Sequence, residues 1–157
     1  MPARLVGMNK LAALLIPAAL STIGACTITT SNDIDPTPLA GYVSGQPWNF
    51  VAGSTDGFLS EGEDNFFAVF YPQQYTACGS IEPNTAHLIV AVPKAVGDYS
   101  MNLSRNMTFV DGNDNRIAVD GRIVVDDITS TTVTGGLHGT YDLDNEVSGQ
   151  FTLTVCP

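Results

Sequence analysis

The sequence predicts an all-β domain, and two observations favour this fold class. Apolar and polar residues alternate with a period of two over residues 132–143 and again over 147–155, as expected for strands with one buried face. Upstream, short runs rich in Val, Ile, Thr, Phe and Tyr are separated by turn-forming clusters of Gly, Pro, Asn and Asp. About eight to ten short strands joined by tight turns predict an antiparallel β-sandwich, with a closed up-and-down β-barrel as the alternative.

The last two strands should form a long hairpin across the turn Asp144-Asn145-Glu146. The alternation predicts that one face is buried, with Tyr141 and Leu143 at its end. A third strand, roughly Gly121 to Ile128, should precede this hairpin, entered through a two-residue turn at Asp120-Gly121.

Five further strand segments are expected upstream. Leu88 to Val92 is apolar throughout, which predicts a strand buried on both faces. Trp48 alternates with Phe50 and Ala52, so we interpret it as a core residue rather than a ligand platform. The other segments are Gly41 to Val43, Trp48 to Ala52 after the turn Ser44-Gly45-Gln46-Pro47, Asn65 to Tyr71, and a strand presenting Tyr99, Met101 and Leu103.

Residues 1–25 read as a targeting segment. Arg4 and Lys10 lie beside the amino terminus, and the apolar run from Leu11 to Ile23 has 13 residues, whereas a membrane-spanning helix needs about 20. This pattern is typical of a signal peptide that is removed during export.

The end of this segment, Ile23-Gly24-Ala25-Cys26, resembles the lipobox of bacterial lipoproteins. The resemblance implies cleavage before Cys26 and acylation of that cysteine, which would anchor the chain in a lipid bilayer. Thr27 is not the aspartate that signals inner-membrane retention in that family, so an outer-membrane destination is implied, periplasmic or surface-facing. The alternative is a plain secretory signal with Cys26 as an ordinary thiol.

The resemblance also implies where the folded domain begins and which cysteines can pair. Residues 26–39 are polar, contain two prolines and are expected to form a flexible tether before a single β-domain at 40–157. Three cysteines leave an odd thiol, and lipidation of Cys26 removes it from the count. Cys78 and Cys156 are then expected to form a disulfide in an oxidising compartment, unless both remain thiols.

Charge excludes one class of partner. The chain carries 6 Lys or Arg and 16 Asp or Glu, and removal of Arg4 and Lys10 leaves 4 cations against 16 acids, a net charge of −12. Binding of nucleic acid requires a basic patch that neutralises phosphates, so it is not expected here.

Metal binding has two weak candidates, at Asp111 and Asn113 and at Asp142, Asp144 and Glu146. Both clusters place oxygen ligands two residues apart, as Ca²⁺ prefers. The same residue types are the usual turn formers, and neither cluster has the glycine and glutamate of an EF-hand loop. We therefore expect no cofactor, with a calcium ion as the alternative.

No catalytic constellation stands out. His138 falls on the polar face of its strand and is interpreted as a solvated histidine, as is His87. Glu61, Glu63 and Asp64 could supply a carboxylate pair, but such a pair needs one carboxyl in an apolar cleft, and a solvated loop is the simpler interpretation.

The pattern as a whole is similar to the small disulfide-bonded β-domains carried by lipoproteins of Gram-negative bacteria. It leads us to expect a membrane-anchored, non-enzymatic module that binds a protein or glycan partner in the cell envelope. A domain that binds a small ligand or Ca²⁺ is one alternative, and a hydrolase using the acidic loop is another.

Overall fold

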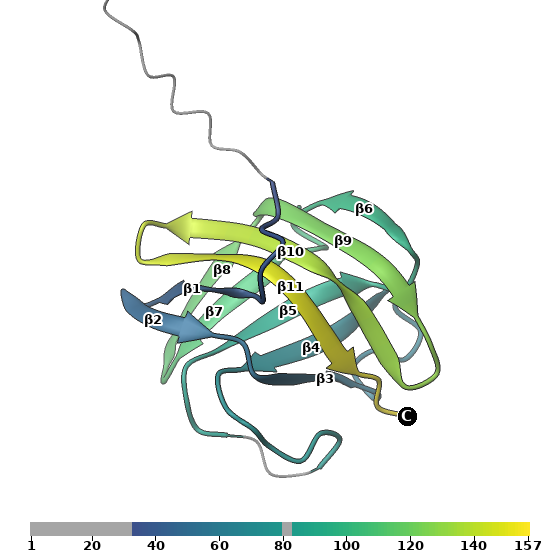
Figure 1. The fold of residues 1–157 in the computed structure, drawn as a ribbon. Helices are drawn as coiled ribbons and strands as arrows, with labels where there is room; N and C mark the ends of the chain where they lie inside the picture. Colours follow the sequence, from purple (N-terminus) through teal and green to yellow (C-terminus); the bar gives the residue numbers. More distant parts are fainter. Residues whose placement is uncertain (1–32, 80–82) are drawn as a thin grey trace, which may run out of the picture. The chain divides into compact units, whose positions relative to one another are not determined.

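A computed structural model describes residues 33–79 and 83–157, and the described residues form strands and turns but no helix (Figure 1). The all-β prediction is therefore confirmed. The strands are β1 (Ala40–Val43), β2 (Gln46–Asn49), β3 (Ala52–Asp56), β4 (Asn65–Tyr71), β5 (His87–Pro93), β6 (Gly97–Ser100), β7 (Met107–Asp111), β8 (Asp114–Ala118), β9 (Asp120–Ile128), β10 (Thr132–Asp142) and β11 (Asn145–Thr154).

These strands belong to one hydrogen-bonded sheet in the order β6-β9-β10-β11-β3-β4-β5-β7-β8, with β1 added to β11 and β2 to β1. Neighbouring strands run antiparallel except β11 and β3, which are joined through a single parallel pair, Thr154 and Ser54. The sheet is open and curls into a half-barrel. Arg116 of β8 and Asp142 of β10, whose side chains are 3.7 Å apart, bring two strands distant in the sheet order together.

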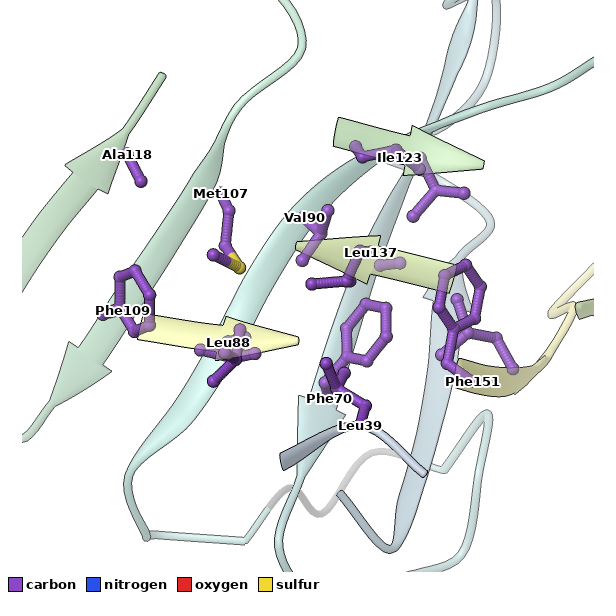
Figure 2. Packing of buried hydrophobic residues seen from close by; sticks show 14 of the residues in the cluster. Leu39, Phe70, Leu88, Val90, Met107, Phe109, Ala118, Ile123, Leu137 and Phe151 are labelled. Carbon is purple, nitrogen blue, oxygen red and sulfur yellow. The ribbon is translucent and has the colours of Figure 1, made fainter. Parts of the chain in front are cut away.

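The core lies inside this curl. Figure 2 shows side chains of β4, β5 and β7 facing side chains of β9, β10 and β11. The rings of Phe70 and Phe151 meet edge to face at 5.4 Å, and Leu88, Ile123 and Leu137 are fully buried. Complete burial of one such side chain contributes about 1.5 to 3 kcal/mol, so this cluster is the main source of stability.

Trp48 is a core residue, as predicted. Its side chain is 3% exposed and packs within the buried cluster. The indole Nε1 donates a hydrogen bond to the carbonyl oxygen of Ala86 at 3.1 Å, which satisfies the ring's single polar group.

The predicted C-terminal hairpin is confirmed along most of its length, but its tip differs. Tyr141 and Leu143 were expected to face the core and are 52% and 91% exposed. The pairing register shifts between Thr140 and Asp142, which ends the alternation before Tyr141. The connection is Leu143-Asp144, because Asn145 already belongs to β11.

The turn predicted at Asp120-Gly121 is not formed. Both residues lie in β9, and β8 pairs with β7 rather than with β9. The β7–β8 hairpin turns at Gly112-Asn113, where Gly112 has the positive φ of 59° that glycine adopts without strain. Gly121 instead permits close packing, since a Cβ there would stand 2.2 Å from the carbonyl oxygen of His138.

Two upstream predictions also need correction. Strand β5 contains Leu88 to Val92 as expected, but Ile89 and Ala91 are half-buried, so only one face is fully covered. Strand β6 ends at Ser100, and Leu103 is 87% exposed instead of continuing the alternation. An apolar run alone does not show whether a second layer covers the other face.

The domain begins before residue 40, within the segment expected to be a tether. Leu39 is fully buried, and its backbone N–H donates to the carbonyl oxygen of Gln150 at 2.9 Å. Gln150 in turn donates from its backbone to Thr37, and its side chain donates to the carbonyl oxygen of Asp35 at 2.9 Å. Asp35 to Leu39 therefore lie along β11 as part of the domain. Residues 26–32 of the predicted tether lie outside the described residues.

Two glycines of the β10–β11 hairpin make room for this segment. A Cβ at Gly149, where φ is 142°, would stand 2.5 Å from the Cα of Leu39. A Cβ at Gly136 would stand 2.7 Å from the Cγ2 of Ile34. Larger residues at these positions would displace the segment, which explains glycines inside regular strands.

Candidate functional site

The predicted disulfide is present. Cys78, in the loop after β4, is bonded to Cys156, which follows β11, and the two Cα atoms are 5.4 Å apart. The backbone N–H of Cys156 also donates to Thr55 Oγ1 at 2.9 Å, which holds the C-terminal segment against β3. Cys26, the predicted site of lipidation, lies outside the described residues.

Two open clefts lie side by side at the end of the molecule where β5 ends. The first cleft has a volume of about 520 Å³, and its lining includes Phe58, Glu61, Phe66 and Pro157. The second cleft has a volume of about 460 Å³. Lys94 lines both clefts. The residues lining the second cleft are Glu63, Asp64, Asn65, Pro93, Lys94, Ala95, Tyr99, Ser104 and Arg105.

Lys94 fixes the wall between these clefts. Its Nζ donates a hydrogen bond to the carbonyl oxygen of Ser60 and lies 5.4 Å from the centre of the Phe66 ring. Its backbone N–H donates to the carbonyl oxygen of Asp64 at 3.1 Å. These contacts tie the end of β5 to the loop between β3 and β4.

Arg105 holds the opposite side of the second cleft. Its guanidinium carbon lies 5.0 Å from the centre of the Tyr99 ring, and its Nε donates to the carbonyl oxygen of Ser100 at 3.2 Å. The Tyr99 hydroxyl donates to the carbonyl oxygen of Ala95 at 3.0 Å. The cleft therefore has a preformed wall of one aromatic ring and one cation.

The four cations of the described residues fall into two classes. Arg116 and Arg122 each bind a carboxylate at 2.6 Å, that of Asp114 and that of Asp98. The hydrogen bond from Arg122 is the main reason that the pKa of Asp98 lies below its usual value. Lys94 and Arg105 are in none of the ion pairs formed among the described residues. Their side chains instead contact carbonyl oxygens and aromatic rings, and both line the second cleft.

The sequence analysis found the acidic residues of the clefts but missed both cations. The three acidic residues are exposed, and they are divided, because Glu61 lines the first cleft while Glu63 and Asp64 line the second. Lys94 and Arg105 lie far apart in the sequence. The signal that could have directed attention to them is their rarity, since the predicted mature chain has only four cations.

The interpretation of His138 as a solvated residue is wrong. Its side chain is 7% exposed, although it lies on the outer face of β10 as expected. It is paired across the strands with Ser148, whose hydroxyl accepts the backbone N–H of Asp35 at 3.0 Å. Asp35 of the N-terminal segment therefore lies on this face beside Ser148, a placement that the strand pattern alone could not indicate.

His87 is half-buried rather than fully solvated. Its ring lies with its centre 5.0 Å from that of Tyr71, and its Nδ1 is 2.9 Å from the carbonyl oxygen of Thr85. Both contacts hold the start of β5 in place.

The candidate metal ligands lie in two hairpin turns, and part of their binding capacity is used within those turns. Asp142 Oδ1 accepts hydrogen bonds from the backbone N–H of Asp144 at 3.0 Å and from the side chain of Asn145 at 2.8 Å. Asp111 and Asn113 belong to the β7–β8 turn, while Glu146 is in β11. Among residues 33–79 and 83–157, no group of three acidic, histidine or cysteine side chains converges in a way that could hold a metal ion.

Asn145 connects the β10–β11 turn to the β1–β2 turn. It is 1% exposed, and its Oδ1 accepts the backbone N–H of Ser44 at 2.9 Å. Gly45 donates to the carbonyl oxygen of Asp144 at 2.8 Å. The β1–β2 and β10–β11 turns are thus bound to one another, which is a structural role for these polar residues.

Within the part of the chain that the structure describes, no helix is long and apolar enough to cross a membrane. Comparison of the chain with protein-family models, with curated proteins and with solved structures finds no match. Arguments about function therefore rest on the residues themselves.

Proposed function

We propose that this chain is a lipoprotein of the bacterial cell envelope, anchored through Cys26 and carrying a β-domain that binds a partner without catalysing a reaction. The lipobox Ile23-Gly24-Ala25-Cys26 is the observation that carries the anchoring. The cysteine count supports it: the disulfide occupies Cys78 and Cys156, which leaves Cys26 as the one cysteine outside that bond. The destination is the outer membrane, with the domain facing the periplasm or the cell surface.

The finer description of the fold is part of this proposal. Strands β6, β9, β10 and β11, with β1 and β2, form one half, and β3, β4, β5, β7 and β8 form the other. Only the Thr154–Ser54 pair joins the halves at the β11–β3 edge, and apolar side chains pack between them. We describe this arrangement as a sandwich whose two layers are continuous at one edge.

The binding role draws its support from the two clefts around Lys94. Their walls are preformed by hydrogen bonds and ring contacts, which lowers the entropic cost of binding. Two carboxylates, two cations and an aromatic ring line the second cleft, and this composition suits hydrogen bonding to a polar protein segment or a glycan.

Anchoring is tested by expressing the full chain in a Gram-negative host. We expect the chain to fractionate with membranes, and mass spectrometry of its N-terminal peptide to show an acylated residue 26. The variant Cys26→Ser should be found in the soluble fraction, while Cys78→Ser should stay with the membranes. A wild-type chain that is soluble and carries a free thiol at Cys26 would overturn the proposal.

Binding is tested by photo-crosslinking in the native envelope. A photoreactive residue in place of Glu63, in the second cleft, should capture a partner that the same residue in place of Asp114, which is also exposed, does not capture. Identical crosslinking patterns from the two positions would contradict a partner site at the cleft.

A further inference from the structure

The rim of the second cleft is closed by contacts among the four chain segments that line it. The segment before β4 meets the end of β5 where the backbone N–H of Lys94 donates to the carbonyl oxygen of Asp64 at 3.1 Å. The same segment meets the turn after β6 where Asn65 Nδ2 donates to the carbonyl oxygen of Ser104 at 3.5 Å. Segments that are distant in the sequence are thus joined on two sides of the cleft.

Tyr99 completes the rim on the remaining side. Its hydroxyl donates to the carbonyl oxygen of Ala95 at 3.0 Å, and its ring centre lies 5.0 Å from the guanidinium carbon of Arg105. Ala95 follows Lys94 in the chain and Arg105 follows Ser104, so the contacts form a continuous circuit around the opening. The cleft is therefore a fixed part of the domain, and a ligand would meet walls that are already ordered.

Opposite charges line this cleft without neutralising one another. The side chains of Glu63 and Asp64 form no hydrogen bond or ion pair among the described residues, and neither Lys94 nor Arg105 binds a carboxylate there. Both carboxylates are exposed, whereas both cations are half-buried. The closed rim keeps the charges of opposite sign apart, although they line the same space.

Arg105 has donors left for an anion. Its Nε is used by the carbonyl oxygen of Ser100 at 3.2 Å, but Nη1 and Nη2 form no hydrogen bond among the described residues. Two neighbouring N–H groups of a guanidinium match the two oxygens of a carboxylate. The ring of Tyr99 supports the guanidinium, so little side-chain freedom remains to be lost when an anion binds.

Lys94 is committed to the first cleft to a greater extent than to the second. Its Nζ donates to the carbonyl oxygen of Ser60 and lies 5.4 Å from the centre of the Phe66 ring, which lines the first cleft. The free charges of the second cleft are therefore two carboxylates and one guanidinium. A complementary ligand carries an ammonium group for the carboxylates and a carboxylate for the guanidinium.

We propose that the second cleft binds a short peptide whose last residue carries both charges, with its carboxylate on Arg105 and its ammonium group beside Glu63 and Asp64. The inference rests on the binding role proposed for this cleft and names the chemical class of its ligand. The first cleft adjoins the second at Lys94 and is lined in part by Phe58 and Phe66. It offers apolar surface to the preceding residues of the peptide.

Other classes of ligand leave charges in the cleft unmatched. A neutral glycan would bind the carboxylates through its hydroxyl groups but would leave Arg105 without an anion. A phosphate group would bind Arg105 but would be repelled by Glu63 and Asp64, in a chain that is strongly acidic. A metal cation would be repelled by Arg105 and Lys94.

The test measures binding of matched peptides to the full chain in detergent micelles by isothermal titration calorimetry. The probe is N-acetyl-Ala-Ala-Lys, prepared with L-lysine and with D-lysine, whose last residue has a free carboxylate and a free ε-ammonium group. One analogue ends in a carboxamide, and a second has an acetylated ε-amine. We expect the tighter of the two zwitterionic peptides to bind about tenfold more strongly than either of its analogues, because each analogue lacks one charged partner.

Charge-neutralising variants show which residue recognises which group. Arg105→Gln should remove the preference for the free carboxylate over the carboxamide and keep the preference for the ammonium group. The double variant Glu63→Gln with Asp64→Asn should do the reverse. Arg116→Gln is the control, because Arg116 is also half-buried but lies outside the cleft, and it should keep both preferences. A variant that damaged the fold would weaken binding of all the peptides alike.

The outcomes separate this inference from the binding role itself. Equal affinity for the zwitterionic peptide and its analogues, or no binding of any of them, would overturn the inference, as would tighter binding of free lysine or of chitotriose. In each case a partner captured through position 63 and not through position 114 would leave the binding role intact. Identical crosslinking from the two positions, together with no peptide binding, would overturn both.

Discussion

The two ends of the domain are attached to the sheet in different ways. At the N-terminal end, Ile34 to Leu39 lie along the β10–β11 hairpin, held by hydrogen bonds to β11, by one leucine buried in the core and by the space that two glycines leave. At the C-terminal end, the Cys78–Cys156 bond ties the last residues to the loop after β4. The first attachment depends on the shape of its neighbours, whereas the second is covalent. We expect small changes in packing to weaken the first attachment and chemical reduction to break the second.

The largest effect is expected from removing the covalent attachment. Replacement of Cys78 and Cys156 by alanine opens a loop spanning 78 positions, and chain entropy predicts a loss of about 4 to 5 kcal/mol in the free energy of unfolding. Urea denaturation of the Cys26→Ser chain, with and without the two replacements, measures the difference. An unchanged midpoint would show that the bond contributes little to stability.

Leu39→Ala is expected to have the next largest effect. Its side chain is fully buried, so the truncation should lower the free energy of unfolding by about 2 to 5 kcal/mol in the same assay. Leu59→Ala serves as the control, because Leu59 is 49% exposed and its truncation should change little. Equal midpoints for the two variants would contradict the burial of Leu39 and would support the prediction from sequence that it belongs to the tether.

Gly149→Ala should loosen the N-terminal attachment itself. The added Cβ would overlap the Leu39 backbone, and such overpacking destabilises by about 1 to 3 kcal/mol. Hydrogen exchange should show faster exchange at the backbone amides of Leu39 and Gln150, which bond across this contact. Gly112→Ala is the control: its φ is positive but no atom lies within 4 Å, so it adds about 1 kcal/mol of backbone strain without speeding exchange at those amides.

The smallest effect is expected for the ion pair between Arg122 and Asp98. Arg122→Gln removes the hydrogen bond that lowers the pKa of Asp98, so that pKa should rise toward its usual value. Because the pKa of Asp98 is lower in the folded protein, its contribution to stability is present above the unfolded pKa and is lost as the pH falls through the folded value. Carboxyl NMR titration of Asp98 measures the shift, and Arg116→Gln should leave it unchanged.

The residues that sequence analysis placed well share one property: their environment is set by their own strand and its turns. Trp48, the strand Asn65 to Tyr71 and the C-terminal hairpin follow from local alternation. His138 and Leu39 were misplaced for the same reason, because the burial of a residue depends on contacts that the alternation of its own strand does not contain. The clefts could not be predicted, since they join the loop after β3 to the end of β5 and the turn after β6.

The sequence by itself determined the strand content and the strong negative charge, because periodicity and composition need no coordinates. It predicted the pairing of Cys78 with Cys156 only through the lipobox resemblance, which assigns Cys26 to a lipid. It did not determine that one curled sheet contains all the strands, that residues 35–39 lie along β11 as part of the domain, or that Lys94 and Arg105 line one cleft. Those features depend on contacts between residues far apart in the chain. A pattern with a period of two shows that a strand has two faces, but only the folded structure decides what covers each of them.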